Sequence, residues 1–295
     1  MKLYMNRILE ATFLVSLITL FFLLSIHTAN GQEYTKFSDL KAALSKPSQV
    51  ERLILSNQGL SEFPVEIFQF SNLEFLDLSG NNISKLPENV SNISNLKYLD
   101  LSGNSFSELP KSISEMESLN ILRIGYLPNL DLKKAFPAIE GLKNLKVLDL
   151  KYDNITELPS SIGKFTNLES LDLSGNPIEV VPASLSKLGR LEVFYLNNDM
   201  ELDLDRSINS LQSIPNLKEL HLENDGLSLI PEEIIKMKKL EQLYLNNNSI
   251  QVLPKGLEKM EKLRFIDMSK NPIPRESLKS AEELLAPKIK INIKN

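Results

Sequence analysis

The residue with the clearest potential for acid–base or metal chemistry is His221. It alternates along the chain with Glu219 and Glu223, so in a β-strand all three side chains would point to the same face. An imidazole between two carboxylates could bind a metal ion or act as a general base. The alternative is a solvated strand face with no chemical role, and we favour that alternative.

The composition excludes several classes of catalyst. The 295 residues include no Cys, no Trp and two His, which leaves no disulfide framework, no thiolate nucleophile and no Cys-ligated metal site. G-x-S-x-G, H-E-x-x-H, a Walker loop and a Rossmann glycine run are all absent from the sequence. The formal net charge of −5 argues against a nucleic-acid partner, which needs a basic face. We therefore expect no enzyme activity and no cofactor or metal.

Leucine and asparagine, with 54 and 27 residues, recur at a fixed spacing that must organise the rest of the chain. Leu73, Leu76, Leu78, Asn81, Leu86 and Pro87 reappear 23 residues later as Leu96, Leu99, Leu101, Asn104, Leu109 and Pro110. Ten units run from Val50 to Ile273; they start at Val50, Leu73, Leu96, Leu119, Leu145, Leu168, Leu191, Leu217, Leu240 and Leu263. The apolar alternation at the start of each unit predicts a short strand.

The pattern resembles that of the leucine-rich repeat superfamily over residues 50–273, about three quarters of the chain. Its "L-P-x-x-I-x-x-L" second half is similar to the Ras-group-like type of bacterial and of intracellular plant and animal members. The resemblance implies an α/β fold, a curved horseshoe solenoid with a parallel concave sheet. Strands ~4.8 Å apart would make eleven of them span roughly 50 Å.

The resemblance also implies an inward-facing polar ladder at the ninth position of each unit. The side-chain amide there would satisfy buried backbone groups of the loop that leaves the sheet. The matching residues are Asn81, Asn104, Asn176, Asn248 and Asn271, with Asp153, Asp199 and Asp225 in three units and Gln58 in the first. An aspartate accepts but cannot donate unless protonated, so we expect its loops to be looser.

Two units have 26 residues instead of 23, and they share Leu-Asp-Leu at 130–132 and 202–204. Apolar residues at helical spacing follow in both, which predicts a helix on the convex side. In the first of these units we expect a late start, because Pro137 would break an earlier one.

The sequence divides into a signal peptide (1–31), an N-terminal capping helix (32–49), the ten-repeat solenoid (50–273) and a C-terminal cap (274–295). Both ends of a solenoid need such caps. Phe37, Leu40 and Leu44 would share one face of the first helix. Leu278, Ala281, Leu284 and Leu285 suggest a second amphipathic helix, and Ile289 and Ile291 an eleventh strand. Lys288 and Lys290 would then protect its open edge by their charge.

The N-terminus has the order of a secretory signal: Lys2 and Arg7, the apolar run 13–26, then the small residues Ala29 and Gly31. The alternative is a retained membrane anchor, for which fourteen apolar residues are short of the ~20 that span a bilayer. Either segment would export the protein. The absence of Cys suits a bacterial envelope, periplasm, cell surface or medium, better than a eukaryotic extracellular module.

The concave face is the remaining place for function. Asp is the family default in the middle outward column, and the departures from it cluster at Arg123 and at Tyr195, His221 and Tyr244. The predicted partner-binding residues are Arg123, Tyr126, Lys151, Tyr152, Tyr195, His221, Glu223 and Tyr244. Aromatic residues and Arg are enriched in interfaces. Drift on an unconstrained surface is the alternative, and the sequence leaves both open.

We therefore predict a non-catalytic, exported recognition scaffold, a monomer that binds a protein or peptide ligand on its concave face. One alternative is a membrane-anchored structural or adhesive surface protein, with membrane contact only if the N-terminal segment is retained. An enzyme of the type that fuses such repeats to a ubiquitin ligase would need a further domain and a nucleophilic Cys, and the sequence has neither.

Overall fold

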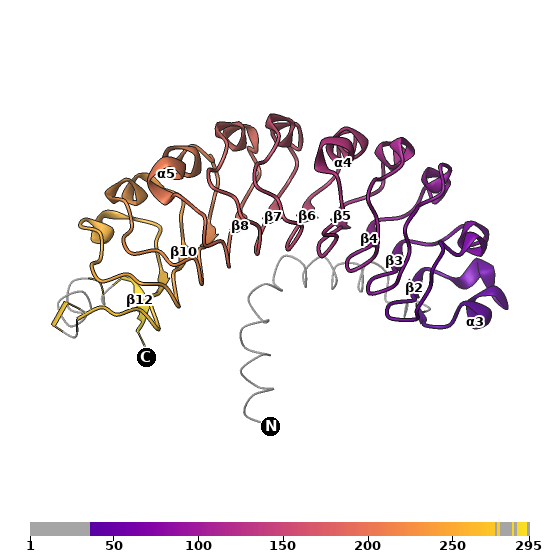
Figure 1. The fold of residues 1–295 in the computed structure, drawn as a ribbon, viewed down its shortest axis with the longest axis horizontal. Coiled ribbons are helices and arrows are strands. Elements are labelled where there is room, and N and C mark those ends of the chain that lie inside the picture. Colours follow the sequence, from indigo (N-terminus) through magenta and orange to yellow (C-terminus); the bar gives the residue numbers. More distant parts are fainter. Residues whose placement is uncertain (1–35, 275, 278–284, 286–287, 294–295) are drawn as a thin grey trace, which may run out of the picture.

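The computed structural model describes residues 36–274, 276–277, 285 and 288–293. In them the chain forms a curved solenoid with a sheet along its concave side and helical segments along its convex side (Figure 1). Within these ranges no helix has the length and hydropathy needed to cross a bilayer. The predicted signal segment, residues 1–31, and the predicted helix at Leu278, Ala281 and Leu284 lie outside the described residues.

The sheet contains twelve parallel strands in sequence order. They are β1 (Lys36–Phe37), β2 (Arg52–Ile54), β3 (Phe75–Asp77), β4 (Tyr98–Asp100), β5 (Ile121–Arg123), β6 (Val147–Asp149), β7 (Ser170–Asp172), β8 (Val193–Tyr195), β9 (Glu219–His221), β10 (Gln242–Tyr244), β11 (Phe265–Asp267) and β12 (Lys290–Asn292). Their register aligns equivalent residues of successive units, such as Leu148 with Leu171. These inward leucines are fully buried, so the predicted solenoid with its parallel concave sheet is confirmed.

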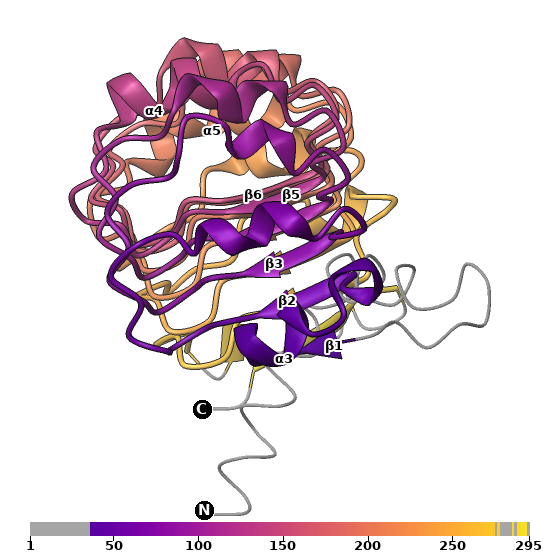
Figure 2. The same cartoon turned by 90° about the vertical axis from the view of Figure 1, so that its right-hand side faces the viewer.

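The return path of most 23-residue units is a short 3₁₀ helix. These helices are η2 (Val65–Gln69), η3 (Val90–Asn92), η4 (Lys111–Glu115), η5 (Ser160–Lys164), η6 (Ala183–Lys187), η7 (Glu232–Lys236) and η8 (Leu257–Lys259). A proline caps the start of η2, η4, η5, η6 and η7. Proline suits that position because the first helical donors have no intrahelical acceptor. In the view of Figure 2 the central coils have their helices at the top and their strands below, and the N-terminal coils with β2 and β3 lie lower because the solenoid is curved.

The two 26-residue units form the α-helices α4 (Leu132–Ile139) and α5 (Leu204–Gln212). Each begins directly after an aspartate, Asp131 or Asp203, whose side chain accepts a hydrogen bond from a backbone N–H of the first turn. The predicted late start of the first helix is wrong, because Pro137 lies inside α4. It is on the exposed face of the helix, where water can satisfy the carbonyl that the missing donor leaves free.

The N-terminal end differs from the prediction in one respect. Phe37 lies in β1, which pairs with β2, and the helix α3 (Leu40–Leu44) starts after it with Asp39 as its cap; η1 (Pro47–Gln49) follows. The sheet therefore has twelve strands rather than eleven. At the other end β12 pairs with β11, and Lys288 and Lys290 are exposed as predicted.

The asparagine ladder is present and buried. The Nδ2 of Asn176 donates to the carbonyls of Leu150 at 2.8 Å and Leu173 at 2.7 Å. Its Oδ1 accepts from the backbone N–H groups of Asp153 at 2.9 Å and Ile155 at 3.0 Å. The amides of Asn81, Asn104, Asn248 and Asn271 make the same type of bonds to the neighbouring loops. Gln58 is the exception, since it is exposed and donates to Ser38 in the cap.

Aspartates replace the amide in three units, with different results. In Asp153 and Asp225 one oxygen accepts a backbone N–H, while Oδ2 is buried and has no hydrogen-bond partner in the described part of the chain. Burial raises the pKa of Asp153 to about 7 and that of Asp225 to about 8. In Asp199 both oxygens accept, from Ile178 and Glu201, and burial raises its pKa to about 6.

Candidate functional site on the concave face

Three adjacent strands bring Tyr195, His221 and Tyr244 into one aromatic stack. The residues are direct partners in the register of β8, β9 and β10. The ring of His221 lies 4.2 Å from that of Tyr195 and 4.1 Å from that of Tyr244, measured between centroids, and is nearly parallel to the latter. In-register parallel pairing is the cause, because it places equivalent side chains about one strand spacing apart.

Carboxylates flank the imidazole of this stack. Nδ1 of His221 lies 3.2 Å from Oε2 of Glu223, and Nε2 lies 3.8 Å from Oε2 of Glu219. Burial lowers the pKa of His221, but the interactions with Glu219 and Glu223 outweigh burial, so that the pKa is raised. The two carboxylates therefore favour the protonated form of the imidazole more than burial alone would.

The side chains of the stack are largely buried. The sequence predicts only that they face outward from the sheet, and Tyr195 and Tyr244 are each 7% exposed while His221 is 4% exposed. They lie outside the main apolar core and cover one another on the concave surface. Burial also raises the pKa of both tyrosines above its ordinary range. Their removal should consequently cost some stability as well as surface.

Arg123 belongs to a second cluster, on β4 to β6. Its Nε lies 3.1 Å from Oδ2 of Asp149 and its Nη1 lies 3.4 Å from Oδ2 of Asp100. Lys151 shares Asp149, with 3.2 Å between Nζ and Oδ2. The guanidinium also donates to the hydroxyl of Tyr98 at 3.4 Å. Each cation of this cluster thus already has a carboxylate partner.

Tyr126 and Tyr152 lie beside this cluster, in the loops that follow β5 and β6. Their rings are stacked, with centroids 4.8 Å apart and 13° between the planes, and they are 48% and 40% exposed. Nζ of Lys151 lies 5.8 Å from the ring centre of Tyr126. The eight predicted residues therefore form two clusters: Arg123, Tyr126, Lys151 and Tyr152 in one, and Tyr195, His221, Glu223 and Tyr244 in the other.

Models of known protein families match the same repeats. A model described as "Leucine rich repeat" matches residues 48–106 and 215–273, and one described as "Leucine-rich repeat region" matches residues 129–225. The chain belongs to the leucine-rich repeat superfamily. No curated protein matches its sequence.

Solved structures of leucine-rich repeat proteins have the same fold. An internalin from Listeria monocytogenes is 18% identical, with a TM-score of 0.55 over 87% of this chain and 88% of that one. The leucine-rich repeat domain of the type III effector XopL is 23% identical, with a TM-score of 0.58 over 86% of this chain and 79% of that one. At such identities the likeness concerns the fold.

The concave face of this leucine-rich repeat protein also has an apolar group that was not predicted from the sequence. Phe75, Tyr98, Ile121 and Val147 form a cluster of their own, separate from the main core. The rings of Phe75 and Tyr98 are stacked 4.0 Å apart, and the guanidinium of Arg52 lies 4.0 Å above Phe75. The signal was in the sequence, since these residues occupy the same outward position of successive units, where later units have Glu219 and Gln242.

The leucine-rich repeat sheet thus presents aromatic and cationic side chains on its concave surface. Among the described residues, no three His, Cys, Asp or Glu side chains are placed to hold a metal ion. Apart from Ile54 in the first unit, the side chains that depart from the aspartate default are aromatic or cationic, and ion pairs and ring stacking fix their positions. Such an array can bind a partner, with little side-chain freedom to lose.

Proposed function

We propose that this leucine-rich repeat protein is a non-catalytic scaffold that binds a protein or peptide on its concave face. Membership of the superfamily supports a protein-binding repeat scaffold. The observation that carries the proposal is the grouping of aromatic and cationic residues on neighbouring strands, in a column where aspartate is the default. Tyr and Arg are the types that dominate the energetics of interfaces.

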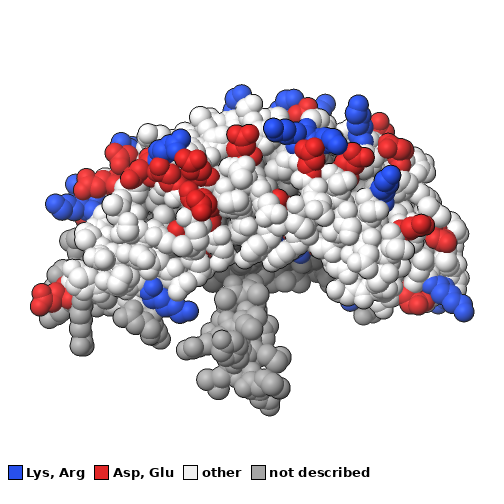
Figure 3. Space-filling model, viewed as in Figure 1, with Lys and Arg blue, Asp and Glu red and all other residues white. Residues whose placement is uncertain are grey.

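The distribution of charge on the remaining surface supports the same choice of face. In Figure 3 the charged side chains gather along the convex margin, over the helical segments. Many of them are lysines with high exposure, such as Lys164, whose side chain is 59% exposed although it pairs with Glu140. Exposed Lys is depleted in interface cores, so the convex side is the less suitable contact surface.

Export completes the proposal. The order of Lys2, Arg7, the apolar run 13–26 and Gly31 supports a signal peptide of residues 1–31. The absence of Cys favours a bacterial exported protein, the repeat pattern favours the Ras-group-like type, and we propose that the protein acts as a monomer. The domain limits proposed from the sequence, with caps at 32–49 and 274–295, stay part of this proposal. A membrane-anchored structural or adhesive surface protein is the second candidate, supported by the same apolar run; N-terminal sequencing of the exported protein separates the two.

Replacement of Tyr195 and Tyr244 by Ser should weaken binding to the natural partner at least tenfold, or ~1.4 kcal/mol. The reason is that the double substitution removes both aromatic rings from the proposed contact surface. Binding would be measured by titration of the full chain with a partner protein isolated by cross-linking from the producing cells. Because both tyrosines are buried in the stack, the denaturation midpoint of the variant must first show that it is folded at the assay temperature.

The matched control is on the opposite side of the solenoid. Lys164, Lys187 and Lys255 are exposed on the convex side, and their replacement by Ala should change affinity less than twofold. Weaker binding by the lysine variant together with unchanged binding by the folded tyrosine variant would show that the partner does not use the concave face.

A further inference from the structure

One loop position has the same unusual backbone in every repeat unit. The residue directly before the ladder position has a positive φ in all ten units: Asn57, Gly80, Gly103, Tyr126, Tyr152, Gly175, Asn198, Asn224, Asn247 and Lys270. Glycine adopts this left-handed conformation without strain, and asparagine tolerates it better than other residues. Seven of the ten positions have one of these two residues, as the backbone requires.

Tyr126 and Tyr152 are the clear exceptions, with φ of 58° each. A bulky aromatic residue in the left-handed region is an outlier that the fold itself disfavours. Two such residues occur in adjacent units, and their exposed rings stack on each other. Strain of this kind, kept at an exposed site, points to a function of the side chains rather than to a need of the fold.

Glycines at the same loop position of the neighbouring units leave space beside the two rings. A Cβ atom at Gly175 would lie 2.3 Å from Cδ1 of Tyr152, so Tyr152 packs directly against this glycine. On the other side, Gly103 is the equivalent residue of the unit before Tyr126, and a Cβ there would meet backbone atoms of Gly80 alone, at 3.5 Å and beyond. One face of Tyr126 is covered by Tyr152; no Tyr126 atom lies within 4 Å of the Cβ position at Gly103, and the side chain is 48% exposed.

The two cations beside the pair already have a carboxylate partner. Lys151 and Arg123 are both paired with Asp149, so neither is free to attract an acidic group. Neither phenol hydroxyl of the pair forms a hydrogen bond within the described residues, so two O–H donors are available. A polyproline II segment matches this combination: its rings pack on aromatic faces, and its carbonyls have no internal hydrogen bonds.

We propose that Tyr126 and Tyr152 anchor the partner by binding a proline-containing extended segment, with a proline ring on the open face of Tyr126. This proposal rests on the proposed function, because it names the chemistry of the partner at the loops that follow β5 and β6. It also ranks the two clusters, since Tyr195, His221 and Tyr244 largely cover one another while the Tyr126–Tyr152 pair is open to solvent.

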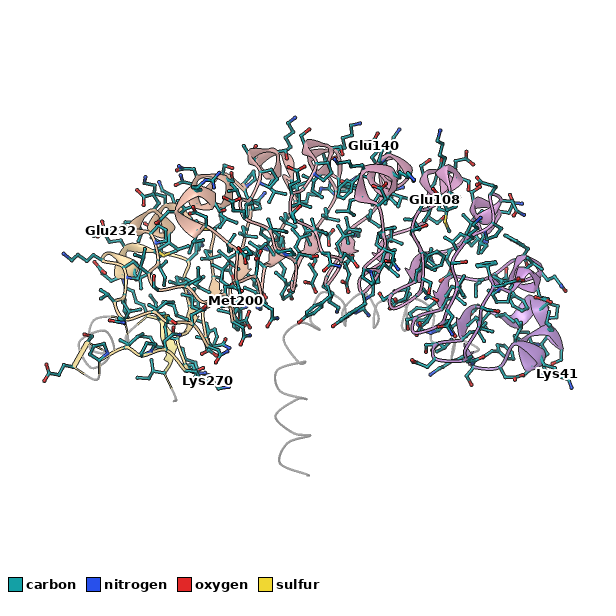
Figure 4. All side chains as sticks on the ribbon, viewed as in Figure 1. Lys41, Glu108, Glu140, Met200, Glu232 and Lys270 are labelled. Atoms are coloured by element: carbon teal, nitrogen blue, oxygen red, sulfur yellow. The ribbon has the colours of Figure 1, made fainter. Side chains whose placement is uncertain are left out.

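The test uses the full chain and a ten-residue polyproline peptide, with a Gly-Ser decapeptide as the reference ligand. The double variant Tyr126→Asn/Tyr152→Asn has the residue that four other units carry at this position. We expect it to bind polyproline at least tenfold more weakly than the wild type, and to unfold at the same or a higher temperature because the strain is removed. Lys270→Asn, at the same loop position in the last unit (Figure 4), should bind like the wild type.

Several results would overturn the inference. The inference is wrong if the wild type does not bind polyproline, or if the double variant binds it equally well. It is also wrong if the double variant unfolds at a lower temperature, because the pair would then have a structural role. Binding of chitohexaose instead of polyproline, lost in the double variant, would make the pair a sugar platform. If polyproline fails while the Tyr195/Tyr244 variant still loses its natural partner, this inference falls and the proposed function stands.

Discussion

Replacing Asn176 with alanine should lower the free energy of unfolding by about 3 kcal/mol or more, since each buried polar group left unpaired costs ~1–3 kcal/mol. The amide makes four hydrogen bonds, two to carbonyls and two from backbone N–H groups. The residue is 1% exposed, so water cannot replace it. Urea denaturation followed by circular dichroism measures the change.

The matched control is a nearby asparagine with the opposite environment. Asn198 is exposed and has a φ of 61°, a conformation that glycine adopts freely. Asn198→Gly should therefore stay within about 0.5 kcal/mol of the wild type. Equal denaturation midpoints for Asn176→Ala and Asn198→Gly would mean that the ladder does not hold the loops.

Asp225→Asn should stabilise the protein by about 1 kcal/mol at pH 5, and by about 4 kcal/mol more at pH 9, because each pH unit between the unfolded and the folded pKa is worth ~1.4 kcal/mol. Oδ2 of Asp225 is buried without a hydrogen-bond partner in the described chain. At the equivalent ladder position of another unit, Nδ2 of Asn176 donates to two backbone carbonyls. A protonated carboxyl can supply one such donor, and an amide supplies two. The amide keeps its donors at every pH, whereas the carboxyl loses its own when it ionises.

The direction of the pH dependence follows from proton binding. Burial raises the pKa of Asp225 to about 8 in the folded protein, above the value of ~3.9 in an unfolded chain. The folded state binds the extra proton between these limits, so the stability it provides is full below pH ~4 and is lost as the pH rises through about 8. Asp225→Asn should remove this part of the pH dependence between pH 5 and 9.

Asp199 is the matched control for this change. Both of its oxygens accept backbone N–H groups, and an amide has a single acceptor oxygen. Asp199→Asn should consequently destabilise the protein by about 1 kcal/mol. If Asp225→Asn and Asp199→Asn shift the denaturation midpoint in the same direction at pH 9, the two aspartates do not differ in their hydrogen-bond partners as described.

Periodicity explains why so much of the fold could be predicted. A fixed 23-residue spacing of Leu, with period-two alternation inside each strand, determines which side chains face inward, and Leu148, Leu171 and Leu220 are fully buried as expected. The first strand was missed because β1 has two residues and lies before the repeats begin. Pro137 was misjudged because its place on the exposed face of α4 depends on tertiary packing.

The candidate site was less predictable, because its residues interact across repeat units. The alternation that places Tyr195, His221 and Tyr244 outward says nothing about how far they stack and cover one another. The left-handed position of Tyr126 and Tyr152 could have been recognised by aligning each unit on its ladder residue, where Gly and Asn predominate. Their stacking depends on the loop backbone and on Gly175.

Recognition through the concave face is tested most directly by site-specific photo-cross-linking in the cells that produce the protein. A benzophenone side chain would replace Asn197 or Asn246, on the concave surface beside the aromatic stack, and in separate variants Lys164 or Lys187 on the convex side. We predict adducts with one and the same partner protein from the two concave positions and none from the convex ones. Adducts from the convex positions, with none from the concave pair, would contradict the assignment of the binding face.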